Sequence, residues 1–246
     1  MHIMNVDFQL VTENIASNLD EKTRILENVA PSWNFVVIFS VILGLVLVKQ
    51  FAAGRMGLVL SMLYQNADTE KVTRGWNPFT SMTSLLITAS YIALTALLIQ
   101  RAMLVFNGNT TLYGGSDFYL EACIFTSAYI IVQYLLINMA GWLFDTRPAS
   151  LHHSMTHLSM AMSMNFALVL LLLVMSFYPT KFFAVIGLII FLIFNAIRLI
   201  KTFVDLHFLI KGETSKIFLY LCTLEILPFS VALTMVFRLI ATDSVL

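Results

Sequence analysis

Long apolar stretches without a charged residue dominate this sequence and constrain what it can fold into. A membrane-spanning helix needs about 20 mostly apolar residues, and several runs of this kind lie between clusters of charged residues. Charged residues make up 11% of the chain and hydrophobic residues 59%, whereas a soluble domain carries roughly 25% charged residues. So few charges cannot cover a soluble surface of this size. The sequence therefore predicts an all-α, polytopic transmembrane helix bundle whose main partner is the lipid bilayer.

Six spans are predicted when charged residues are taken as dividers between helices. The fourth span is the least regular, because its purely apolar part, Phe166 to Tyr178, must be extended backwards through Ser159 to reach membrane length. Whether this helix crosses fully or re-enters stays open. The apolar segment Arg55–Tyr64 is either an interfacial helix or an extension of the first span. The predicted spans are about 33–51, 79–100, 119–143, 158–178, 182–206 and 217–237.

The spans are predicted to form one transmembrane domain, residues 31–240, after an N-terminal extramembrane segment, residues 1–30. In that segment Phe8, Val11 and Ile15 lie at helical spacing, which predicts a short amphipathic helix. Acidic residues precede the first basic one, a pattern unlike that of a cleavable signal peptide.

Lysine and arginine are unevenly divided between the two sides of the predicted bundle. Positive residues concentrate on the cytoplasmic side of membrane proteins, so the side with nine should face the cytoplasm and both termini should lie outside. The side with the termini has five: Lys22, Arg24, Arg101, Lys181 and Arg238. The other side has nine: Lys49, Arg55, Lys71, Arg74, Arg147, Arg198, Lys201, Lys211 and Lys216.

Glu225 is the one carboxylate near the middle of a predicted span, and Pro228 follows it in the same helix. An acid within the membrane is costly unless it pairs, protonates or faces water. One interpretation is a proton or cation site that lines a cavity. The interpretation we favour is a carboxyl group bonded to a neighbouring helix, for example to Arg198, Lys201 or a histidine.

A second group of charged residues lies at the end of the fifth span. Arg198, Lys201 and Asp205 are three and four residues apart, which places them on one helical face. Such a face suits an anion or a lipid headgroup at the cytoplasmic interface. The favoured alternative is an anchor on a solvated helix end, with Lys201 paired to Asp205.

Three histidines precede the fourth span, in a segment rich in methionine. His153 and His157 lie four positions apart in the sequence, so they share a helical face, and His152 directly precedes His153. Imidazole and thioether ligands would suit copper or haem iron. The HExxH pattern of zinc enzymes is absent. We favour a polar helix start at the membrane interface and predict no cofactor.

The sequence assigns no catalytic residue. It contains no phosphate-binding GxxxxGK[ST] loop, GxSxG elbow or GxGxxG fingerprint. Positive and negative side chains balance at 14 each, so no overall field attracts nucleic acid. Hydroxyl and amide residues within the spans, including Gln133, Asn138 and Asn195, favour hydrogen-bonded helix packing over a polar path.

The C-terminal third resembles a family of uncharacterised multi-pass inner-membrane proteins of Bacteroidota, classed as a domain of unknown function. The resemblance is strongest in Leu219-Tyr220-Leu221-Cys222, which is followed by Glu225, Ile226 and Pro228. It extends over roughly residues 30–240 and implies a bacterial inner membrane. It implies no activity and no functional residues.

Three functions remain as hypotheses. The first is a non-enzymatic envelope assembly factor or a subunit of a membrane complex, with other membrane proteins or a second copy as partners. The alternative is a proton-coupled transporter or channel for a small solute that uses Glu225. A membrane enzyme acting on lipid or haem through the histidines is the third.

Overall fold

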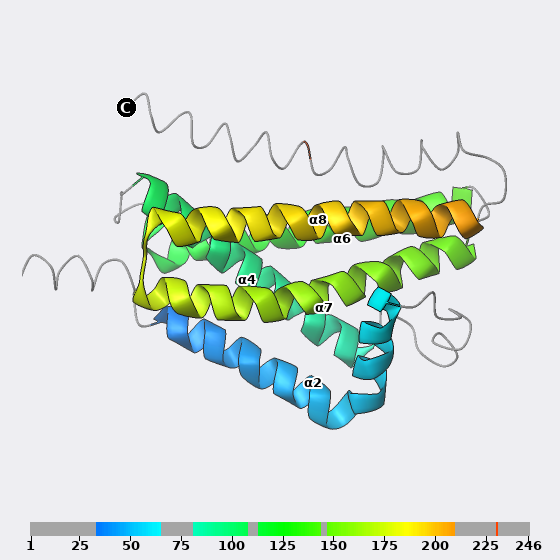
Figure 1. The fold of residues 1–246 in the computed structure, drawn as a ribbon, viewed down its shortest axis with the longest axis horizontal. Coiled ribbons are helices and arrows are strands. Elements are labelled where there is room, and N and C mark those ends of the chain that lie inside the picture. Colours follow the sequence, from blue (N-terminus) through cyan, green and yellow to red (C-terminus); the bar gives the residue numbers. More distant parts are fainter. Residues whose placement is uncertain (1–32, 65–80, 108–112, 144–146, 210–229, 231–246) are drawn as a thin grey trace, which may run out of the picture.

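The fold is a bundle of long helices, which a computed structural model describes for residues 33–64, 81–107, 113–143, 147–209 and 230. All of the elements in this part of the chain are helical, which confirms the predicted all-α class. The predicted sixth span, 217–237, lies almost wholly outside the described residues. The helices, shown side by side in Figure 1, are α2 (Trp33–Tyr64), α4 (Met82–Asn107), α6 (Ser116–Leu143), α7 (Arg147–Phe177) and α8 (Lys181–Leu209).

Each of the five helices contains a segment long and apolar enough to cross a membrane. Burial separates these segments into a centre and a periphery. In the α7 and α4 segments 61% and 56% of the residues are buried, against 28%, 28% and 17% for α2, α6 and α8. α7 packs against each of the other four helices. The bundle is therefore organised around α7 and α4.

The core between α4 and α7 is filled by large aliphatic side chains and methionine. Ile87 and Leu94 of α4 are fully buried, as are Leu168 and Met175 of α7. α8 approaches this core closely at Gly187. A Cβ atom at that position would lie 2.7 Å from Leu171 Cδ2 and 2.8 Å from Leu98 Cδ1. Small residues permit such approach between membrane helices.

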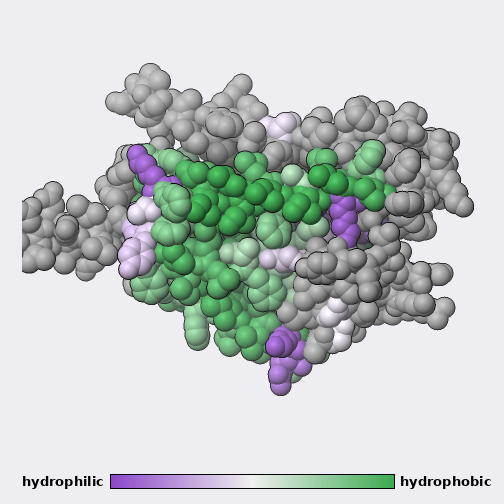
Figure 2. Space-filling model, viewed as in Figure 1, coloured by the Kyte–Doolittle hydropathy of each residue, from purple (hydrophilic) through white to green (hydrophobic). Residues whose placement is uncertain are grey.

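The outer faces of the peripheral helices are apolar. Examples are Phe39 on α2, Ile124 on α6 and Ile200 on α8, each more than half exposed. Figure 2 shows a continuous hydrophobic surface on the side of the bundle that it displays, with hydrophilic residues at its borders. Such a surface is expected where lipid or another membrane protein contacts the helices.

The predicted start of the fourth helix and the predicted end of the second are wrong, and these two errors have the same cause. The fourth helix begins at Arg147 rather than near residue 158, so the histidine-rich segment lies inside a helix of 31 residues. The second continues through Arg101 to Asn107 instead of ending near residue 100. In both places the polar side chains are buried and hydrogen-bonded inside the bundle. In the sequence alone, such residues look the same as those of a loop or of a membrane interface. The predicted third and fifth helices agree with α6 and α8 to within a few residues.

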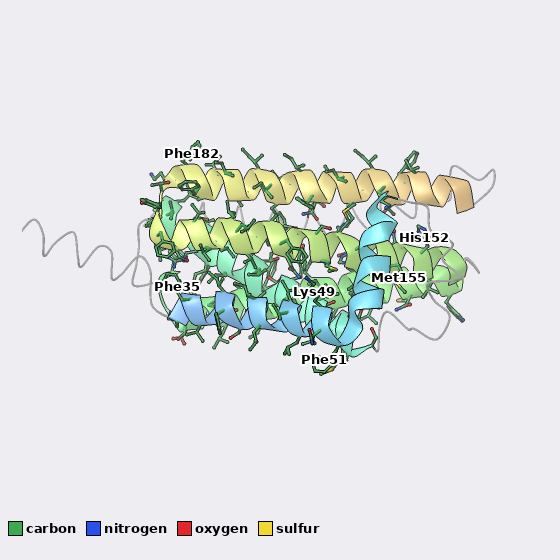
Figure 3. All side chains as sticks on the ribbon, turned by 60° about the horizontal axis from the view of Figure 1, so that its bottom comes forward. Phe35, Lys49, Phe51, His152, Met155 and Phe182 are labelled. Atoms are coloured by element: carbon green, nitrogen blue, oxygen red, sulfur yellow. The ribbon has the colours of Figure 1, made fainter. Side chains whose placement is uncertain are left out.

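The first helix continues beyond its predicted end at residue 51, so the segment Arg55–Tyr64 is an extension of it. The helix bends sharply near Phe51, which is labelled in Figure 3. Its second arm runs up to α7 in Figure 1 and passes across it in Figure 3. The apolar segment suited to crossing a membrane ends at this bend.

Candidate functional site: a buried polar cluster

The centre of the candidate site is a contact between α8 and α7. Nη1 of Arg198 lies 3.0 Å from Nε2 of His157. Both side chains are almost completely buried, with 6% and 5% of their surface exposed. A guanidinium group can only donate hydrogen bonds, so this bond requires an unprotonated Nε2. The arrangement therefore fits a neutral imidazole that accepts a charge-assisted hydrogen bond.

Gln133 of α6 provides a second neighbour for the same nitrogen. Its Oε1 lies 3.2 Å from Nε2 of His157. Nε2 carries either a lone pair or a proton, so it cannot both accept from Arg198 and donate to Oε1 of Gln133. The tautomer of His157 thus decides whether this side chain bonds to Arg198 of α8 or to Gln133 of α6.

Two tyrosines and a threonine complete the cluster. The ring of Tyr134 lies 5.4 Å from that of His157, at an interplanar angle of 54°. The Tyr134 hydroxyl is hydrogen-bonded to Thr88, which connects α6 to α4. Tyr91, one turn further along α4, is buried beside His157 and Arg198. Side chains from α4, α6, α7 and α8 therefore meet in one polar cluster.

A small cavity adjoins the cluster between α7 and α8. It leaves about 10 Å³ for the centre of a water molecule, which is room for about one water. Four of its lining side chains are polar and four are apolar. They are Tyr91, His157, Asn195 and Arg198, and Met160, Ala161, Met164 and Phe194.

The cluster lies inside the membrane-spanning segments, nearer to one face. Arg198 is about 9 Å along the helix from Val204, where the apolar segment of α8 ends. His157 is about 10 Å from Ser150, where that of α7 begins. These two ends belong to the side with the larger predicted number of lysines and arginines.

A second buried arginine lies toward the opposite face. Arg101 of α4 is 2% exposed, and the amide oxygen of Asn34 in α2 accepts from its Nη2 and from its Nε, the latter at 3.2 Å. The preceding residue, Gln100, donates from Nε2 to the carbonyl oxygens of Tyr113 and Gly115, at 3.0 and 2.9 Å. These bonds attach the segment before α6 to α4.

The residues predicted as charged site residues are placed unequally. Arg198 faces the bundle interior, and Lys201, one turn further along α8, is partly exposed. The backbone of Asp205 belongs to α8, but its side chain lies outside the described residues, as does all of Glu225. A shared face for Arg198 and Lys201 with Asp205 therefore stays a prediction, as does a role for Glu225.

The histidines separate into two environments. His153 and His157 are buried on α7, whereas His152, labelled in Figure 3, is partly exposed. Among the described residues no three His, Cys, Asp or Glu side chains are grouped as metal ligands.

The sequence identified Arg198 and His157 separately and did not bring them together. Tyr91, Tyr134 and Asn34 were not singled out at all, and Gln133 and Asn195 counted only as packing residues. The available signal was the number of amide and hydroxyl groups within spans, which indicates bonds between helices but not their partners.

Comparison with protein families matches residues 27–236 to DUF4271, a domain of unknown function. The chain belongs to the DUF4271 family. The match includes all five described helices and most of the predicted sixth span. It confirms the predicted membership of an uncharacterised family, while the bacterial group and the C-terminal motif stay predictions. Searches of curated proteins and of solved structures gave no match to this DUF4271 chain.

Proposed function

We propose that this DUF4271 protein is a non-enzymatic envelope assembly factor or subunit of a bacterial inner-membrane complex. The observation that supports this best is the state of the polar cluster. His157 lies within hydrogen-bonding distance of both Arg198 and Gln133, and the adjoining cavity has room for about one water. So small a space beside the cluster supports a role in holding the helices together over a role in binding a substrate.

The partner surface in this proposal is apolar and lies on the peripheral helices. α8 exposes a row of large aliphatic side chains, including Leu192, Ile193 and Ile200, and α6 exposes Ile124 and Leu135. In a membrane complex, part of such a surface contacts protein and the rest contacts lipid.

Photo-crosslinking in intact membranes tests the proposal. A photoreactive amino acid replaces Ile193 of α8 or Ile124 of α6, with the fully buried Leu168 of α7 as the control position. We expect a protein adduct of defined mass from one of the exposed positions and none from residue 168. Native mass spectrometry from nanodiscs should give the same stoichiometry. A monomer that forms adducts with lipid alone would contradict the proposal.

Proton-coupled transport is the second candidate, and one observation favours it. His157 is a titratable group within a membrane-spanning segment, beside a permanent charge and a water-sized cavity. Intramembrane histidines commonly take part in proton relays. Proteoliposomes with an imposed pH gradient would test this candidate. Proton flux that His157→Gln or Glu225→Gln abolishes would favour transport, and flux equal to that of empty liposomes would exclude it.

Both termini are proposed to face the periplasm. Arg101 and Arg198 are buried in the bundle, so they say little about which loops are positive. Without them the two sides hold four and eight lysines and arginines instead of five and nine, and the bias keeps its direction. Periplasmic and cytoplasmic reporter fusions at each terminus would test the orientation.

A further inference from the structure

α8 carries an exposed stripe of β-branched side chains, which we call the α8 stripe. Its members follow one another at intervals of four, three and four residues, the spacing that brings side chains onto one helical face. Each is between 41% and 61% exposed: Ile193, Ile197, Ile200 and Val204. α8 packs against α7 and α4 and lies at the edge of the described helices in Figures 1 and 3. The stripe is therefore open to a further element.

The α8 stripe suits a helix as its neighbour. Apolar exposure alone does not show what covers it, because lipid tails are as apolar as these side chains. A β-branched side chain in a helix is held mostly in one rotamer, so packing it against protein costs less side-chain entropy than packing a long flexible one. The stripe is thus prepared for close contact with another helix.

The order of the helices along the chain indicates which helix this is. Among the five described helices each packs against the next: α2 against α4, α4 against α6, α6 against α7 and α7 against α8. Seven residues, 210–216, separate α8 from the predicted sixth span, 217–237. Connections of about two to eight residues are common between packed helices, and short connections make the two helices antiparallel neighbours.

The same short connection predicts the register of the two helices. Both rise by about 1.5 Å per residue in opposite directions, so residues equally far from the connection lie at the same level. Val204 is then level with Cys222, and Ile193 with Leu233. The four residues opposite the stripe repeat its spacing and are all apolar: Cys222, Ile226, Phe229 and Leu233. One apolar row thus faces another of the same length.

We propose that the α8 stripe is the docking surface for segment 217–237 of the same chain, which packs against it as an antiparallel helix. In this register Glu225 is level with Lys201, one of the neighbours suggested for it by the sequence. The exposed face of α6, with Ile124, is left as the surface for a separate partner protein. The inference does not depend on the proposed function.

Disulfide formation with the native Cys222 tests the contact. Val204→Cys is made together with Cys123→Ser, so that the chain holds only the new cysteine and Cys222. We expect mild oxidation in native membranes to join these two within one chain, which alkylation and intact mass spectrometry record as loss of two free thiols. Ile193→Cys with Cys123→Ser is the matched control. It lies on the same stripe but about 16 Å further along α8, so it should not react with Cys222.

A second pair tests the direction and register of the docked helix. Ile193→Cys and Leu233→Cys, in a chain with Cys123→Ser and Cys222→Ser, should also form a disulfide within one chain. Absence of the disulfide from either pair would overturn the proposal. Disulfides between two chains, seen as a dimer that a reductant removes, would also overturn it, because they would place a second copy on the stripe.

Discussion

In the part of the chain that the structure describes, two arginines are buried, and their surroundings differ in chemistry. Arg101 connects α4 to α2 through the amide of Asn34, a group that does not titrate. Arg198 connects α8 to α7 through an imidazole, whose tautomer selects between two neighbours. Both arrangements hold a permanent charge away from lipid. The first can only hold two helices together, whereas the second can also change its bonding with the state of His157.

The two arginines also differ in how many elements they join. The Arg101 contact involves two helices, while the Arg198 cluster includes side chains from four. Hydrogen-bond networks in a low dielectric are worth more than isolated bonds. We therefore expect the structure to depend more on the Arg198 cluster, and the following variants test that ranking.

His157→Leu should have the largest effect. It removes the acceptor for Arg198 and the group near Gln133 while keeping an apolar side chain in the core. A hydrogen bond to a charged group contributes about 1.5–3 kcal/mol, so the free energy of unfolding should fall by about 3 kcal/mol. Unfolding by SDS in mixed micelles would measure it.

A second substitution shows whether that loss arises from the buried charge. Arg198→Met in the His157→Leu background removes the guanidinium and restores apolar packing between α7 and α8. The double variant should be more stable than His157→Leu alone, because replacing both partners of a buried pair is far less costly than removing one. Equal or additive losses would show that the two residues are not coupled.

Asn34→Leu should have a smaller effect, about 2 kcal/mol. It removes the amide oxygen that accepts from Arg101, but disturbs only the contact between α2 and α4. Asn138→Leu on the exposed face of α6 is the matched control and should be neutral. A loss at Asn34 as large as that at His157 would remove the distinction between the two arginines.

The sequence predicted the fold class because length and hydropathy decide it, and five of the predicted spans are found as helices. It misjudged the helix ends at Arg101 and in the histidine-rich segment for a physical reason. A polar side chain buried inside a bundle has the same sequence signature as one in a loop. Only its partner distinguishes them, and Asn34 and Arg198 are far along the chain from the residues they contact.

The close approach of α8 to the core was equally hidden from sequence analysis. Gly187 lies in an apolar run where any small residue would look alike, and its role depends on Leu171 and Leu98 from two other helices. The cavity could not be predicted from the sequence for the same reason, because the residues that line it come from α4, α7 and α8. Contacts of this kind follow from the packing of helices and not from their composition.

His157→Gln keeps a hydrogen-bond acceptor for Arg198 but removes the group that can titrate. The amide oxygen of glutamine can accept from Arg198, and glutamine cannot be protonated near neutral pH. We expect a loss of at most about 1 kcal/mol, mainly from the missing ring contact with Tyr134. If the cluster only stabilises the packing of the helices, the variant should complement a deletion strain fully. Loss of complementation by this stable variant would show that the Arg198 cluster does more than the Arg101 contact.

Gly187→Ala should also have a small effect and tests how α8 brings Arg198 to α7. The new Cβ would lie under 3 Å from Leu171 Cδ2 and Leu98 Cδ1. Both are ends of flexible side chains that can shift, so overpacking should cost about 1 kcal/mol. Gly44→Ala on α2, the helix of Asn34, is the matched control, since its nearest neighbour, Ser90 Oγ, is 3.9 Å away. Alanine favours a helix over glycine, so the control should be neutral or slightly stabilising. Equal effects in the same unfolding assay would show that α8 is no more closely packed than α2.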